Sequence, residues 1–165
     1  MFQGVFTALV TPFTEKNTVD YGKLRNLVDM QIEEGVDGLV PVGTTGESPS
    51  LSAEETVKVI QTVVDQVSGR VPVIAGAGSN STDKAVAQTK QVMDLGADAS
   101  LQVVPYYNKP TQEGMIRHFT AIADAADLPM VLYDVPGRTS AALENSTIVK
   151  LSAHERIVGV KTASG

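Results

Sequence analysis

Six apolar runs with the composition of β-strands recur about every thirty residues, and each of the first five precedes a segment with helical periodicity. The runs are nearly continuous in apolar residues, as strands buried on both faces are. They span Val5 to Val10, Gly38 to Val42, Val71 to Ala75, Ala99 to Val104, Met130 to Tyr133 and Ile157 to Val160. Strict alternation of strand and helix requires parallel strands with right-handed crossovers. It therefore predicts an α/β protein, either a doubly wound sheet or a (β/α)8 barrel.

Capping residues indicate where the intervening helices begin. Ser52 and Glu55 have the spacing of a capping box, in which each side chain binds a backbone N–H group of the first helical turn. A buried apolar stripe follows them at Val57, Ile60, Val64 and Val67. Further helices are expected after Asp20, Thr82 and Thr111, and a short fifth one near Asn145 to Leu151.

Composition excludes several classes of function. The chain has 165 residues with 42% hydrophobic residues and a formal net charge of −6, which is typical of a folded domain without a nucleic-acid-binding surface. It has no cysteine, which excludes disulfide and thiolate chemistry. His118 and His154 show no metal-ligand spacing and are expected on helix surfaces, so no metal site is predicted. The absence of an export signal or a long apolar stretch leads us to expect a cytoplasmic protein.

Polar residues whose side chains could take part in catalysis or binding lie where the predicted strands end. They are Thr44, Thr45, Tyr106, Tyr107, Tyr133, Arg138 and Lys161. In a barrel, the carboxyl ends of the strands form one face, and the active sites of this architecture are found there. The glycines of Gly76-Ala77-Gly78 lack the remaining features of a dinucleotide-binding motif, so we interpret them as a tight turn.

Lys161 closes the apolar run from Ile157 to Val160. An amine buried in apolar surroundings has a lowered pKa and can act as a nucleophile that forms a Schiff base. The alternative is a lysine at the end of a strand that reaches solvent. Because phenols and hydroxyls are predicted at the same face, we expect a buried amine.

Four motifs, in order and spacing, resemble those of the dihydrodipicolinate synthase family of pyruvate-dependent class I aldolases. They are Gly43-Thr44-Thr45-Gly46-Glu47, Tyr106-Tyr107-Asn108-Lys109-Pro110, Tyr133 to Thr139, and Gly159-Val160-Lys161. The resemblance extends from Phe2 to the last residue. Asp134 stands where the family often has asparagine, and Thr162 stands where an acidic residue is common. Neither change removes a catalytic group.

The resemblance implies four catalytic residues. Lys161 would form an imine with pyruvate, and Tyr133, at the end of its strand within reach of the lysine, would pass protons during that step. Thr44 would link Tyr133 to Tyr107, which in the family comes from the neighbouring subunit of a tight dimer. The chemistry would need no cofactor beyond the covalent imine.

The resemblance also implies how the substrates are held. Thr45 and nearby backbone amides would bind the carboxylate of pyruvate, and Arg138 would bind that of L-aspartate 4-semialdehyde. The product would be 4-hydroxy-tetrahydrodipicolinate, a precursor of diaminopimelate and lysine. An effector pocket for lysine would include Ser48, Asn80, Lys84 and Tyr106. We expect weak or absent feedback, because Lys84 would repel the ammonium group of lysine.

The length of the chain is short for a closed barrel, which usually takes about 250 residues. We expect residues 1–165 to form a single incomplete barrel domain with about the first six strands and five helices, without strands seven and eight and their helices. The family is commonly a homotetramer, and open sheet edges favour association. Two alternatives remain: a related sugar-acid aldolase such as N-acetylneuraminate lyase, or a catalytically inactive barrel fragment that self-associates.

Overall fold

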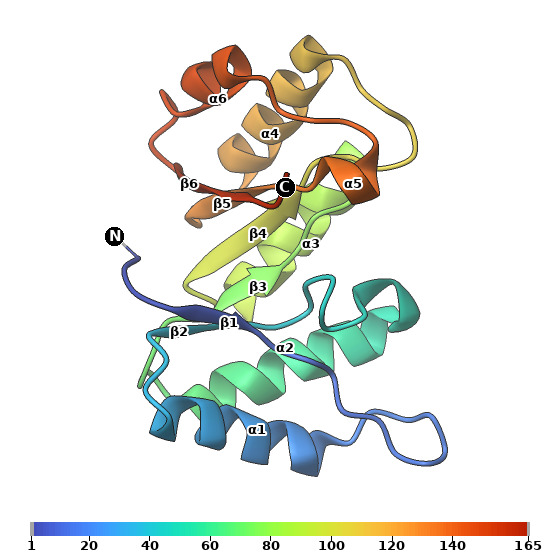
Figure 1. Ribbon diagram of the computed structural model, residues 1–165, viewed down its shortest axis with the longest axis vertical. Helices are drawn as coiled ribbons and strands as arrows, with labels where there is room; N and C mark the ends of the chain where they lie inside the picture. The colour runs from blue at the N-terminus through green and yellow to red at the C-terminus, as the bar shows by residue number, and fades with distance from the viewer. Residues whose placement is uncertain (1, 165) are drawn as a thin grey trace. The chain divides into compact units, whose positions relative to one another are not determined.

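The computed structural model describes residues 2–164, which divide into two compact units (Figure 1). The first unit runs as far as Gly76 and also includes Asp94–Asp98. The second unit consists of Ala77–Met93 and the chain from Ala99 onward.

The first unit contains parallel strands and two long helices. In chain order, its elements are β1 (Phe6–Ala8), α1 (Tyr21–Glu33), β2 (Gly38–Val40), the 3-10 helix η1 (Ser48–Ser50), α2 (Ala53–Val67) and β3 (Ile74–Gly76). Strand β1 pairs in parallel with β2, and Leu39 of β2 forms a parallel bridge with Val73. Helices α1 and α2 lie side by side (Figure 1), and their buried faces include Leu24, Val28, Ile60 and Val63.

The second unit contains a parallel sheet in the order β4-β5-β6. Its elements are α3 (Thr82–Asp94, whose last residue belongs to the first unit), β4 (Ala99–Val103), α4 (Gln112–Ala125), β5 (Met130–Asp134), α5 (Pro136–Thr139), α6 (Asn145–Leu151) and β6 (Ile157–Thr162). Helices α4 and α6 lie next to each other (Figure 1). Phe119, Ile122, Leu132, Leu151 and Ile157 belong to one buried core cluster that joins these helices to the strands.

Each predicted strand region overlaps one of the six strands in the described residues, although β3, β5 and β6 end one or two residues later than predicted. The five predicted helices correspond to α1, α2, α3, α4 and α6. The capping box is confirmed: the Ser52 hydroxyl accepts a hydrogen bond from Glu55 N–H at 3.1 Å, and Glu55 Oε2 accepts one from Ser52 N–H at 2.9 Å. Strand β3 begins later than predicted, at Ile74. Pro72 lies in the predicted run and has no N–H group to donate to a sheet. The short helices η1 and α5 were not predicted.

The expectation that both histidines lie on helix surfaces is wrong. His118 is only 5% exposed, because it falls on the buried stripe of α4 with Met115, Phe119 and Ile122. Its Nδ1 lies 2.9 Å from the hydroxyl of Thr82. His154 is half-buried in the turn between α6 and β6.

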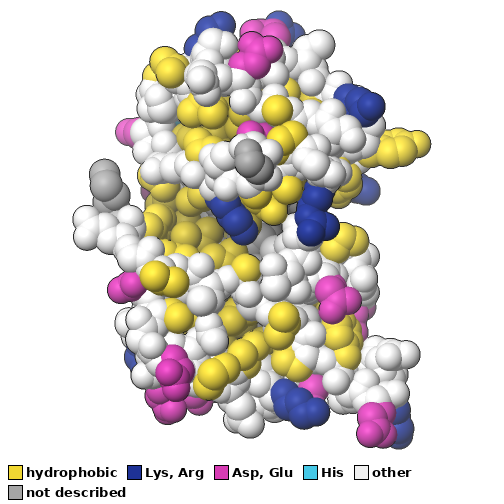
Figure 2. Space-filling view, in the orientation of Figure 1, with side chains coloured by type: hydrophobic (Ala, Val, Ile, Leu, Met, Phe, Trp, Pro, Cys, Tyr) yellow, Lys and Arg dark blue, Asp and Glu magenta, His cyan; other side chains and the backbone are white. Residues whose placement is uncertain are grey.

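The surface retains some exposed apolar side chains. Figure 2 shows hydrophobic side chains on the visible face of the molecule. In the second unit, Val149 of α6 is 69% exposed and Val158 of β6 is 44% exposed. None of the helices within residues 2–164 is long and apolar enough to cross a membrane.

Candidate active site

Lys161 and Tyr133 lie directly opposite each other in the second unit. The parallel register of β5 and β6 pairs Tyr133 with Lys161, and Asp134 with Thr162. Partners in such a register point to the same face of the sheet, so the two side chains meet. Lys161 Nζ lies 4.5 Å from the centroid of the Tyr133 ring, a cation–π distance. The structure therefore places the amine beside the phenol, as the sequence analysis expected.

The expectation that the amine is buried is wrong for the described chain. Tyr133 is only 7% exposed, but Lys161 is exposed. Lys161 lies within β6 rather than after it, and β6 pairs with β5 along one edge. Within residues 2–164, no strand lies along the other edge of β6 to cover the lysine. The amine is therefore oriented by the face of the Tyr133 ring while it stays open to solvent.

Arg138 lies on α5, the short helix that directly follows β5. Arg138 N–H donates to Val135 C=O at 2.8 Å, which ties the start of this helix to the end of the strand. The guanidinium is exposed, and within the described residues it makes no hydrogen bond or ion pair. A planar cation left free in this way can bind a carboxylate in a bidentate manner.

Tyr106 and Tyr107 lie in a loop after β4 that two asparagines brace. Asn80 Nδ2 donates to Tyr106 C=O at 3.2 Å, and Asn108 Nδ2 donates to Asn80 C=O at 3.0 Å. Tyr107 has a positive φ of 73° and is 90% exposed. A bulky residue in the left-handed region is strained, so the bracing bonds hold the loop in a conformation that presents the Tyr107 ring outward.

Lys84, which was predicted at an effector pocket, is exposed on α3. Of the other residues predicted for that pocket, Asn80 and Tyr106 also belong to the second unit, and Ser48 belongs to η1 of the first unit.

Thr44 and Thr45 are exposed in a tight loop of the first unit, after β2. Gly46 N–H donates to Gly43 C=O and Glu47 N–H donates to Thr44 C=O, both at 3.1 Å. The N–H groups of Thr44 and Thr45 donate no hydrogen bond within residues 2–164, so they can bind an anion.

Sequence reasoning missed Thr11, a buried residue that anchors this loop. Its hydroxyl donates to Gly46 C=O at 2.7 Å. A side chain at Gly46 would crowd Leu9 O and Val42 N, so glycine lets the loop pack against the end of β1. The only sequence signal for Thr11 is its place just after an apolar run.

Residues 1–165 match the dihydrodipicolinate synthetase family over the whole chain. This chain belongs to that family. A curated relative from Citrifermentans bemidjiense, named 4-hydroxy-tetrahydrodipicolinate synthase, is 56% identical over 165 residues, which are 100% of this chain and 57% of the relative. The dihydrodipicolinate synthetase family is an enzyme family of lyases and synthases.

Solved structures from the family have the same α/β fold with parallel strands. The 4-hydroxy-tetrahydrodipicolinate synthase of Methylacidiphilum fumariolicum is 43% identical with a TM-score of 0.98, and the match covers 100% of this chain and 55% of that chain. A dihydrodipicolinate synthase from Acinetobacter baumannii, whose structure is a complex with pyruvate, is 50% identical with a TM-score of 0.96, covering 98% of this chain and 55% of that one. The chain thus has the fold of the family's TIM barrels and spans little more than half the length of these relatives.

No group of three or more histidine, cysteine, aspartate or glutamate side chains in the described part of the chain is arranged to hold a metal ion.

Proposed function

We propose that Lys161 is the imine-forming residue of a synthase that condenses pyruvate with L-aspartate 4-semialdehyde to 4-hydroxy-tetrahydrodipicolinate. The observation that carries the proposal is the pairing of Lys161 with Tyr133 across β5 and β6, with the amine 4.5 Å from the ring centroid. The family to which the chain belongs, and the names of its relatives, support the reaction class.

In the proposed first step, the unprotonated amine of Lys161 attacks the keto carbon of pyruvate. The resulting carbinolamine loses water to give a protonated imine, which withdraws electrons so that a methyl proton can leave and an enamine forms. The Tyr133 phenol carries protons to and from the intermediates. In the proposal, Thr44 and a Tyr107 from a neighbouring copy continue this proton path, and the 90% exposure of Tyr107 suits a residue that acts on another subunit.

Two anion sites complete the proposed site. Thr45 and the free amides of its loop bind the pyruvate carboxylate, and Arg138 binds the carboxylate of the aldehyde. The enamine then attacks the aldehyde carbon, which becomes a hydroxyl-bearing carbon. The amino group of the second substrate next attacks the imine carbon and displaces the Lys161 amine, which closes the ring of the product and regenerates Lys161. No cofactor takes part in this proposal. We place the reaction in the biosynthesis of diaminopimelate and lysine, in the cytoplasm, with a homo-oligomer such as the family's homotetramer as the active assembly.

Regulation by lysine is proposed to be weak or absent. Lys84 is exposed, and its ammonium group repels the side-chain ammonium of an incoming lysine. The Asn80 side chain donates to the backbone C=O of Tyr106, which fixes these two residues relative to each other.

One alternative has an observation in its favour. Lys161 is exposed, Val158 is 44% exposed, and both lie on the edge strand β6. An open strand edge with apolar side chains promotes pairing with another chain, as expected of an inactive fragment that self-associates. For the other alternative, N-acetylneuraminate lyase, we find no favouring observation, since Arg138 suits the carboxylate of a short aldehyde acid.

Treatment of the chain with pyruvate and borohydride tests the proposal, with mass spectrometry of the peptides as the readout. We expect a reduced pyruvate adduct on Lys161 and none in a Lys161→Arg variant. Adding L-aspartate 4-semialdehyde before the borohydride should consume the enamine, whereas N-acetylneuraminate should not be cleaved. A folded chain that gives no adduct would support the inactive alternative.

A further inference from the structure

The segment that follows Arg138 is irregular and yet well anchored. It leaves α5 at Ser140, which has a positive φ of 56°, and continues to the start of α6. The Thr139 hydroxyl lies within hydrogen-bond distance of Val135 O at 3.2 Å and of Ala141 O at 2.7 Å. The rest of the segment is held by side chains from two other elements.

Gln112, the first residue of α4, makes three hydrogen bonds to this part of the chain. Its Nε2 donates to Ala142 C=O at 2.8 Å. Its Oε1 accepts from Glu144 N–H at 3.2 Å and from the Thr147 hydroxyl at 2.6 Å. These partners lie at least 30 residues away along the chain. One amide side chain therefore joins the start of α4 to the end of the segment.

The bonds to Gln112 also complete the start of α6. This helix has seven residues, and its N-cap residue Glu144 makes no side-chain capping bond. Short helices are marginal by themselves, and their first N–H groups need an acceptor. Gln112 Oε1 supplies that acceptor for Glu144 and binds the hydroxyl of Thr147, which is almost fully buried.

Asp134 holds the segment at Leu143, between the two backbone groups that bind Gln112. Its Oδ1 accepts from Leu143 N–H at 3.1 Å, and its side chain is buried. Its backbone C=O accepts from Ala163 N–H at 2.8 Å, which ties the same residue to the end of β6. Among residues 2–164, only Oδ1 of this carboxylate has a hydrogen-bond partner, so the amide oxygen of an asparagine could accept the same bond.

We propose that Gln112 and Asp134 are positioning residues that fix the segment after Arg138 and so set where its guanidinium meets the carboxylate of the second substrate. The inference rests on the function proposed above. Because the Arg138 side chain has no partner of its own in the described residues, its place depends on the backbone of α5. That backbone is anchored to β5 at one end and to Gln112 and Asp134 beyond the other. A loosened segment would have to be ordered again when substrate binds, which weakens binding.

Amide hydrogen exchange tests the anchoring directly. In Gln112→Ala, the amides of Leu143 and Glu144 should exchange about tenfold faster, as expected for the loss of hydrogen bonds that hold a local segment. Peptides from β4 should exchange at an unchanged rate. Glu113→Ala is the matched control, since the neighbouring Glu113 side chain bonds Arg117 and no atom of the segment. Unchanged exchange at both amides would overturn the proposal.

The link to Arg138 is tested by trapping with borohydride. Gln112→Ala should give the wild-type yield of pyruvate adduct on Lys161. In Gln112→Ala, the concentration of L-aspartate 4-semialdehyde that halves the trapped adduct should rise about tenfold. The rise should be larger in Arg138→Ala, which removes the guanidinium itself. Faster exchange with an unchanged aldehyde requirement would show a merely structural anchor and overturn the positioning role.

Two further variants keep the test decisive. If Gln112→Ala does not fold, Gln112→Glu retains the Oε1 acceptor but loses the bond to Ala142, and should accelerate exchange by a smaller factor. Asp134→Asn should leave the exchange of Leu143 at the wild-type rate, because the acceptor oxygen is kept. If the wild-type chain gives no pyruvate adduct, the proposed function fails, whereas the exchange experiment still decides whether Gln112 anchors the segment.

Discussion

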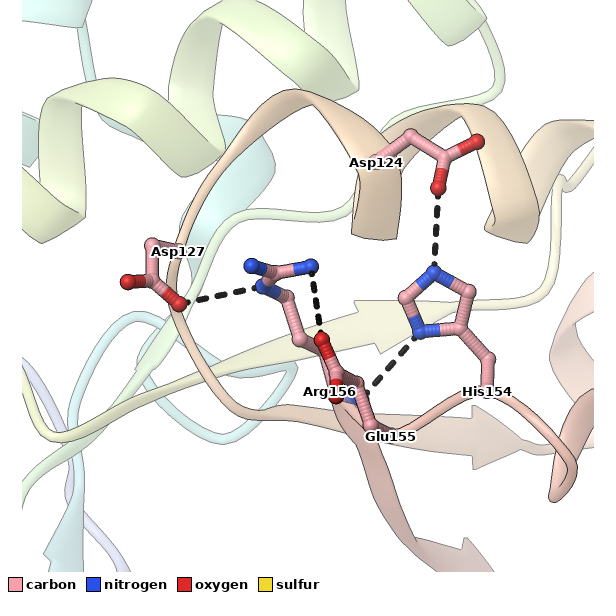
Figure 3. Close-up of polar contacts among 5 residues, drawn as sticks. All are labelled: Asp124, Asp127, His154, Glu155 and Arg156. Atoms are coloured by element: carbon pink, nitrogen blue, oxygen red, sulfur yellow. Dashed lines mark hydrogen bonds and ion pairs between the residues drawn. The ribbon is translucent and has the colours of Figure 1, made fainter.

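The two ends of the β4-β5-β6 sheet differ in whether their charged side chains have ion-pair partners. At the carboxyl ends of the strands, Arg138 and Lys161 have no carboxylate partner within residues 2–164. At the amino ends, Arg156 pairs with Asp127 at 3.1 Å and with Glu155 at 3.4 Å, and His154 lies 3.1 Å from Asp124 (Figure 3). Charges that already have partners join elements to one another. Charges without partners are available to a ligand.

The ion pairs at the amino ends of the strands stabilise the structure. Asp124 lies in the last turn of α4, Asp127 lies in the loop before β5, and residues 154–156 lead into β6. The contacts in Figure 3 therefore tie the loop before β6 to the end of α4 and to the loop before β5. In barrel enzymes, the amino ends of the strands carry stability and the carboxyl ends carry chemistry. The comparison predicts that substitutions at the two ends will separate activity from stability.

The largest effect is expected for Tyr133→Phe at the carboxyl end. Removing the phenol should slow formation of the pyruvate adduct by about 10²- to 10⁴-fold, the usual contribution of a positioned proton-transfer group. The free energy of unfolding should change little, because no hydrogen bond of the Tyr133 hydroxyl is seen within residues 2–164 and the ring is retained. Rates of borohydride trapping and urea unfolding curves measure the two effects.

The comparison would break if Tyr133→Phe slowed the reaction by less than tenfold, or if it destabilised the fold as strongly as it slowed the chemistry. Either result would make Tyr133 a packing residue at a sheet end.

Much of the fold, and the placement of the candidate site at one end of the sheet, could be predicted from the sequence. The apolar runs located the strands, and the order of parallel strands then put Tyr133 and Lys161 at one end of the sheet. The resemblance to the family implied that Tyr133 lies within reach of Lys161, and the structure adds that the two are direct register partners across β5 and β6. Local patterns succeed here because strand burial and helix capping depend on residues close together in sequence.

Long-range contacts were not accessible. Gln112 gave no local signal, since its importance depends on acceptors and donors at least 30 residues away. The burial of His118 and the exposure of Lys161 were predicted wrongly for a related reason. The burial of His118 depends on which face of α4 turns toward the core, and the exposure of Lys161 depends on how many strands flank β6.

The next largest effect is expected for the stability contribution of His118. This residue tests whether a buried polar atom without a partner can have a structural cost and no role in the reaction. Its Nε2 is buried and has no hydrogen-bond partner among residues 2–164, and burial lowers the pKa of His118 to about 4. Between about pH 6.5 and pH 4, the unfolded chain binds a proton that the folded chain does not, so stability rises with pH in this window. Lowering the pH from 7 to 5 should therefore cost about 2 kcal/mol of unfolding free energy from this group.

Urea unfolding followed by circular dichroism at both pH values measures this loss. A His118→Gln variant, which can still bind the Thr82 hydroxyl but does not titrate in this range, should lose most of the pH dependence. An equal pH dependence in the variant would assign the effect to other groups. It would also remove His118 as the example of an unpaired polar atom with a structural cost.

The smallest effect is expected at the paired end. Arg156→Ala should lower the free energy of unfolding by about 0.5–1 kcal/mol, since its guanidinium is partly buried but Asp127 is 90% exposed and ion pairs near the surface contribute little. The yield of pyruvate adduct on Lys161 should stay at the wild-type level. Arg117→Ala is the matched control, because it removes an ion pair within α4 that is exposed on both sides and joins no separate elements. If Arg156→Ala lowered the adduct yield without changing stability, the amino ends of the strands would influence the chemistry, and the division of labour between the two ends would not hold.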